Sequence, residues 1–134
     1  NLEESVLLTS DSTFPTATVE DLSKILSSIY VWKDSWKYSD IEKYLSFYSD
    51  EFKRFDGMQI EQFKKYKQRI FAKKEKKKIR LYNLDISPYP NSLNKKIYKV
   101  IMDEEYVSPT VKFYGKKELY IELIKGEVKI LAEG

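Results

Sequence analysis

Residues 31–52 have the sequence VWKDSWKYSDIEKYLSFYSDEF, and this stretch decides the fold class. Trp32 and Trp36 end a series of apolar residues that begins at Leu22 and recurs every three or four positions. That spacing puts the apolar side chains on one face of an α-helix. We therefore expect one long amphipathic helix over residues 19–37.

Two capping boxes mark where the first two helices begin. Thr18 and Asp21 have the spacing of such a box, with Asp in the position that Glu usually takes. Ser39 and Glu42 repeat the pattern after the first helix. The apolar and aromatic residues that follow at helical spacing predict a second, short helix that ends near Ser49.

After the second helix the sequence period changes from helix to strand. Gly57 breaks the chain, and a third helix is expected from Ile60 to about Lys74. From Lys78 onward the apolar residues alternate with a period of two and are rich in Ile, Val, Leu and Tyr. Turn residues separate four predicted strands, at residues 78–87, 95–107, 113–124 and 127–133. Helices followed by an antiparallel meander indicate an α+β fold.

The composition excludes several classes of chemistry. The chain has 134 residues with no cysteine and no histidine. Thiolate nucleophiles, disulfides, histidine-based triads and the usual zinc sites are therefore impossible within it. We predict no catalytic residue, no metal and no cofactor. No apolar stretch reaches the 18 residues that suggest a membrane-spanning helix, so no membrane span is expected.

The sequence predicts a single domain preceded by a linker. Residues 1–17 show no sustained period and contain Ser, Thr, Asp and Pro, so we expect a linker or interdomain segment there. Residues 18–134 have the size of one compact domain, and 15% of the chain is aromatic, so rings should fill much of its core. Because the sequence begins with Asn1 and shows no signal peptide, we expect it to be a piece of a longer protein.

Positive charge is concentrated in one segment. Residues 60–80 contain ten lysines and arginines but only two acidic residues. Such a run can form a surface for an acidic polymer, for which the candidates are Lys73, Lys74, Lys76 and Lys77. The alternative interpretation is a solvated helix end, where cations suit the helix dipole.

A second candidate site lies on the predicted sheet. Glu104 and Tyr106 fall on the more apolar face of their strand, and Lys117 lies on the next strand. A carboxylate on such a face needs a partner, and Lys117 can supply it. The group forms either a ligand pocket or an ion pair at the rim of the sheet. Trp36 and Tyr44 are either part of that pocket or part of the core.

The first two predicted helices and the residues after them carry a run of residues at mostly four-residue steps: Trp32, Trp36, Asp40, Tyr44, Leu45, Tyr48 and Phe52. This run resembles the opening of a nuclear-transport-factor-2-like (NTF2-like) domain. More specifically, it is similar to the accessory domain of L,D-transpeptidase-family peptidoglycan carboxypeptidases, the cell-shape-determining proteins of the Helicobacter and Campylobacter type. The sequence departs from that family at Phe63, Glu104 and Val128, where Trp, Gln and Trp are common. The later matching positions are Tyr66, Lys67, Glu104, Tyr106, Ser108, Gly115, Lys117, Leu119, Tyr120, Lys129, Ile130 and Glu133.

The resemblance implies a cone-shaped antiparallel sheet packed around helices, in a periplasmic protein. Enzymes of that family cut peptidoglycan with a His and a Cys, which this chain lacks. It would therefore be a non-catalytic accessory module, with peptidoglycan or a muropeptide and the parent protein's N-terminal catalytic domain as partners. One alternative is a small isomerase-type enzyme with Glu104 as general base and Tyr106 as oxyanion donor. A nucleic-acid-binding module ranks last, and no specific nucleic acid is expected.

Overall fold

The computed structural model describes residues 17–134. Within these residues the chain forms three helices and a five-stranded sheet with the strand order β1-β5-β4-β3-β2. The predicted linker, apart from Ala17, lies outside the described residues. The elements are α2 (Val19–Lys37), α3 (Ile41–Ser46), β1 (Tyr48–Arg54), α4 (Ile60–Ala72), β2 (Lys78–Pro88), β3 (Ile97–Val107), β4 (Lys112–Ile124) and β5 (Glu127–Glu133).

Helix α2 has the predicted bounds and the predicted cap. The backbone N–H of Asp21 donates to Thr18 Oγ1 at 3.0 Å, which satisfies one of the free amide groups at the helix start. The apolar face turns Ile25, Trp32 and Trp36 into the core. No helix among residues 17–134 is long and apolar enough to cross a membrane.

The second helix is shorter than predicted, and a strand follows it. Its cap is Asp40, whose Oδ1 accepts from the backbone N–H of Lys43 at 3.3 Å, so the prediction of Ser39 as the cap was wrong. Ser39 instead has a left-handed φ of 57°. The helix ends at Ser46, and β1 then pairs in parallel with β5. That pairing joins residues far apart in the sequence, so no local sequence pattern could predict it.

The four predicted strands form the expected antiparallel meander from β2 to β5. Their bounds agree with the predicted ranges to within two residues. Because β1 adds to β5 in parallel, the whole sheet is mixed. The β4–β5 turn has positive φ at both Lys125 (50°) and Gly126 (79°), as in the type I′ turns that match the twist of a hairpin.

This turn supports a prediction about stability. Gly126→Ala should lower the free energy of unfolding by about 1 kcal/mol, because a side chain is strained at positive φ. Lys125→Asn should raise it by a few tenths of a kcal/mol, since Asn tolerates this conformation better than Lys. Urea unfolding curves of both variants measure the two changes. Equal midpoints for Gly126→Ala and the wild type would contradict the turn geometry.

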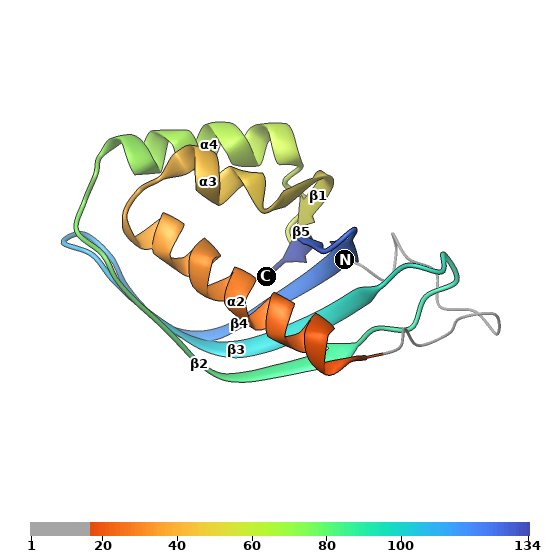
Figure 1. The fold of residues 1–134 in the computed structure, drawn as a ribbon. Helices are drawn as coiled ribbons and strands as arrows, with labels where there is room; N and C mark the ends of the chain where they lie inside the picture. The colour runs from red at the N-terminus through yellow and green to blue at the C-terminus, as the bar shows by residue number, and fades with distance from the viewer. Residues whose placement is uncertain (1–16) are drawn as a thin grey trace.

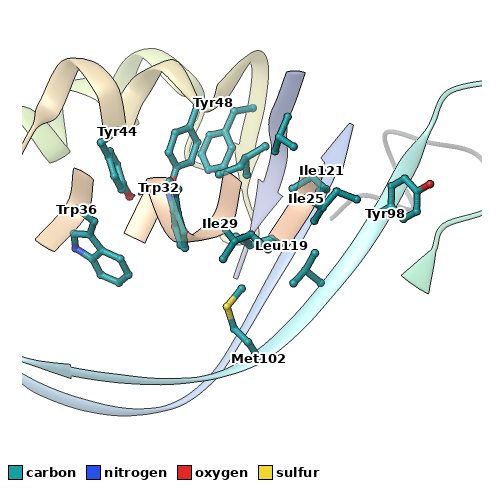
Figure 2. Close-up of a cluster of buried hydrophobic side chains, with 14 of the residues drawn as sticks. Ile25, Ile29, Trp32, Trp36, Tyr44, Tyr48, Tyr98, Met102, Leu119 and Ile121 are labelled. Atoms are coloured by element: carbon teal, nitrogen blue, oxygen red, sulfur yellow. Dashed lines mark hydrogen bonds between the residues drawn. The ribbon is translucent and has the colours of Figure 1, made fainter. Parts of the chain in front are cut away.

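The core lies between the curved sheet and the helices. The sheet curves around α2, and α3 and α4 lie on the far side of that helix (Figure 1). Trp32, Tyr44 and Tyr48 come together above the sheet, while Met102 extends toward them from β3 (Figure 2). Phe63 on α4 is fully buried against Tyr44 and Tyr48. Rings therefore fill the volume that the modest aliphatic content leaves.

Candidate functional site

Three buried charged side chains form an ion-pair network on the inner face of the sheet. Lys117 on β4 lies at its centre, with its Nζ 3.0 Å from Glu133 Oε2 and 3.7 Å from Glu104 Oε1. The three side chains are only 13%, 6% and 8% exposed, in that order. Strand pairing places them together, because β4 lies between β3, which carries Glu104, and β5, which carries Glu133.

A chain of hydrogen bonds joins this network to the aromatic core. The Tyr48 hydroxyl lies 2.6 Å from Glu133 Oε1 and 2.9 Å from the Tyr44 hydroxyl, and it accepts from Trp32 Nε1 at 3.2 Å. A hydroxyl has one proton, and the carboxylate is its strongest acceptor, so Tyr48 donates to Glu133. Three aromatic residues, one each on α2, α3 and β1, therefore help to hold the Glu133 carboxylate in place.

Lys67 on α4 is a further cation near the network. Its Nζ lies 5.6 Å from the ring centroid of Trp36, 5.7 Å from that of Tyr44 and 5.6 Å from that of Phe63. Within residues 17–134 it forms no ion pair shorter than 4.0 Å. Ring faces attract a cation but do not neutralise it. Lys67 therefore keeps hydrogen-bond donors for a ligand.

The electrostatics of the four groups differ. Burial raises the pKa of the Glu104 carboxyl, since Lys117 compensates only in part. Burial alone would also raise the pKa of Glu133, but the Lys117 and Lys67 ammonium groups and the Tyr48 hydroxyl hold it below the ordinary value. The pKa of Lys117 is raised, because its two carboxylates outweigh the effect of its burial. Burial lowers the pKa of Lys67 to about 8.

The structure brings the predicted pocket residues together. The predicted pair of Glu104 and Lys117 is present, and the Lys117 Nζ lies 5.6 Å from the Trp36 ring centroid. Tyr106 stacks on Trp36 with the ring centroids 5.5 Å apart. Tyr44 is buried in the aromatic core and contacts the network through Tyr48. Ligand binding by these residues stays a prediction.

The predicted polyanion surface is smaller than the sequence suggested. Lys73, Lys74 and Lys76 are exposed. Lys77 is buried: its ammonium lies over the Phe71 ring and donates to Ser39 Oγ. Burial also lowers the pKa of Lys77. The Lys77 ammonium is held by contacts inside the domain, so the prediction that Lys77 belongs to the exposed surface was wrong.

Sequence reasoning did not select Lys67, Tyr48 and Glu133 as site residues. Lys67 had a usable signal, because it lies four residues after Phe63 and four before Phe71 and so shares their face of α4. In the part of the chain that the structure describes, no cluster of three or more acidic side chains could hold a metal ion. The arrangement instead offers paired charges and aromatic faces, which suit a ligand that carries both signs of charge.

Comparison with known proteins identifies the family. The profile described as the Cds6 C-terminal NTF2-like domain matches residues 24–134. The chain belongs to this family. Two crystal structures of the helical cell shape determining protein Pgp2 from Campylobacter jejuni match with TM-scores of 0.85 and 0.80, both at 42% identity over 88% of this chain. Bd1075 from Bdellovibrio bacteriovorus matches with a TM-score of 0.71 at 29% identity over 86% of this chain.

The chain corresponds to one part of these relatives. It covers 41% and 42% of the two Pgp2 chains and 38% of Bd1075. An NTF2-like protein of unknown function from Pseudomonas putida matches at 12% identity with a TM-score of 0.70, which shows the fold alone. No curated protein matches. The predicted family resemblance and the NTF2-like α+β fold are thus confirmed.

Proposed function

We propose that this domain is a non-catalytic accessory module of a periplasmic peptidoglycan L,D-carboxypeptidase or L,D-transpeptidase involved in cell shape. It would bind a muropeptide and position it for an N-terminal catalytic domain of the same protein. Homology to part of Pgp2, a helical cell shape determining protein, supports the biological setting. The absence of cysteine and histidine from the chain supports the accessory role.

The observation that carries the proposal is the charged cluster of Lys67, Glu104, Lys117 and Glu133. A peptide stem of peptidoglycan carries carboxylates and amino groups, so its recognition needs both signs of charge. Lys67 has no carboxylate partner among the described residues and is suited to a ligand carboxylate. Glu104 is paired only at 3.7 Å and can accept from a ligand amine.

The isomerase-type alternative has less support. The Glu104 carboxylate is paired with the Lys117 ammonium at 3.7 Å within a site whose burial raises the pKa of Glu104, and the Tyr106 ring is stacked on Trp36. A general base with an oxyanion donor needs both groups aimed at one reacting atom. The geometry supports a binding role for Glu104 better than a catalytic one.

Lys67→Met gives a direct test of muropeptide binding. We expect it to weaken the binding of a purified tetrapeptide muropeptide by about 10- to 150-fold, the value of a charge-assisted hydrogen bond of about 1.5–3 kcal/mol. Isothermal titration calorimetry with the 134-residue chain measures this. Lys65→Met is the matched control, since Lys65 is exposed on the same helix and the substitution is the same.

Two outcomes would contradict the proposal. Equal affinities for Lys67→Met and Lys65→Met would show that the ligand does not use the cluster. Release of the terminal D-alanine by this chain alone would show that it is not an accessory module. Circular dichroism of both variants should match the wild type, because no ion pair of Lys67 with a described residue is lost.

A further inference from the structure

A separate pocket of about 700 Å³ lies at the end of the fold where β3 turns into β4. Three segments line it: the C-terminal end of α2, the connection from α4 to β2, and the β3–β4 turn, all at the left in Figure 1. Its volume is within the roughly 300–1,000 Å³ of small-ligand sites. It shares no lining residue with the charged cluster. The lining residues are Lys37, Tyr38, Lys76, Lys77, Lys78, Val107, Ser108 and Pro109.

The lining of this pocket is positive and lacks a carboxylate. Lys37, Lys76 and Lys78 form no ion pair shorter than 4.0 Å with any residue in the 17–134 range. Glu75, the acid of the connecting segment, already accepts from Thr110 Oγ1 at 3.1 Å. Three cations from two segments thus line one hollow beside a single nearby acid, and this excess of positive charge favours an anionic ligand.

The remaining surface of the pocket is apolar. Val107 and Pro109 line it, together with the Tyr38 side chain, which is 71% exposed. The Ser108 hydroxyl oxygen already accepts from the backbone N–H groups of Thr110 and Val111. Lysine ammonium groups impose little directional geometry on an anion, unlike the planar guanidinium of Arg. A ligand would therefore be selected by charge and apolar contact.

We propose that this pocket binds a short acidic peptide segment that carries an apolar side chain. Its carboxylates pair with Lys37, Lys76 and Lys78, and its apolar side chain packs on Tyr38 and Pro109. A nucleic acid fits less well, because the pocket has one exposed ring where single strands need a row of stacking surfaces. This site is additional to the proposed muropeptide site.

The test uses the peptide acetyl-Glu-Glu-Leu-Glu-amide, labelled with a fluorophore and titrated with the 134-residue chain. Lys76→Gln/Lys78→Gln should weaken binding about tenfold, since each exposed charge pair contributes up to about 1 kcal/mol. Lys53→Gln/Lys65→Gln removes the same charge from exposed positions outside the pocket and should change the affinity less than about twofold. A peptide with Gly in place of Leu should bind about threefold more weakly.

Each of three results would overturn the proposal. Equal losses in the two double variants would show a diffuse charge effect with no pocket. If inorganic phosphate displaces the peptide at a concentration equal to the peptide's dissociation constant, the pocket is a site for simple anions. Loss of peptide binding in Lys67→Met would place the peptide at the charged cluster, and this result would leave the proposed muropeptide site intact.

Discussion

Glu133→Ala is expected to lower the free energy of unfolding by about 3–5 kcal/mol, the usual cost of removing one partner from a buried ion pair. The carboxylate is the nearer of the two partners of Lys117, at 3.0 Å, and it accepts from Tyr48 at 2.6 Å. Without it, the buried Lys117 ammonium keeps only Glu104, at 3.7 Å. The Tyr48 hydroxyl also loses its strongest acceptor. The loss is a large fraction of the 5–15 kcal/mol that is typical of whole domains.

Glu127→Ala is the matched control for this prediction. Glu127 begins the same strand, β5, but is exposed, so the same substitution should change the stability by less than about 0.5 kcal/mol. The loss of stability in Glu133→Gln should lie between those of Glu133→Ala and Glu127→Ala, because an amide can still accept from Tyr48 but cannot neutralise Lys117. Urea unfolding of the three variants provides the measurement. A Glu133→Ala variant as stable as Glu127→Ala would show that the network does not hold the fold.

Acid should weaken the same interaction. The pKa of Glu133 is lowered in the folded protein, so the folded state binds its proton less readily than the unfolded chain does. The resulting stabilisation is fully present above the unfolded pKa of about 4.3 and is lost as the pH falls through the folded pKa. Glu133→Gln should therefore show a smaller loss of stability between pH 6 and pH 3 than the wild type.

The predicted elements depended on periodicity, and periodicity fails where pairing is long-range or irregular. Helix α2 and four strands had clear local patterns. Strand β1 did not, since its buried residues Tyr48 and Phe52 are four apart and fit a helix as well as a strand. Its conformation is set by parallel pairing with β5, at the other end of the chain.

The sequence pattern also predicted only part of the candidate site, because alternation holds on regular strands and fails at an irregularity. Glu104 and Lys117 lie on regular strands, so alternation placed both on the inner face. Glu133 lies after an irregularity in β5, where Tyr120 pairs with Ala132 but Ile121 pairs with Ile130. The extra residue reverses the alternation and turns Glu133 inward. Strict alternation from Ile130 would have turned it outward, so its role could not be predicted from the sequence pattern.

Muropeptide binding is expected to fall about tenfold between pH 7 and pH 9. The cause is Lys67, whose pKa burial lowers to about 8, so that it loses its proton in this range. A ligand carboxylate binds the protonated form, and proton linkage then weakens the affinity by up to tenfold per pH unit above that pKa. Three neighbouring groups keep their protonation state in this range. The pKa of Lys117 is raised, and burial raises those of Tyr44 and Tyr48 well above 10.

Lys67→Arg separates this effect from any general effect of alkaline pH. A guanidinium stays protonated throughout the range, so the affinity of Lys67→Arg should be nearly constant between pH 7 and pH 9. Calorimetric titrations of both proteins with the tetrapeptide muropeptide, at five pH values, give the comparison. If Lys67→Arg loses affinity in parallel with the wild type, another group titrates and Lys67 does not contact the carboxylate. If the affinity of Lys67→Arg stays constant while that of the wild type falls, the ligand's carboxylate binds at position 67. Lys67 is the cation of the cluster that has no carboxylate partner among the described residues.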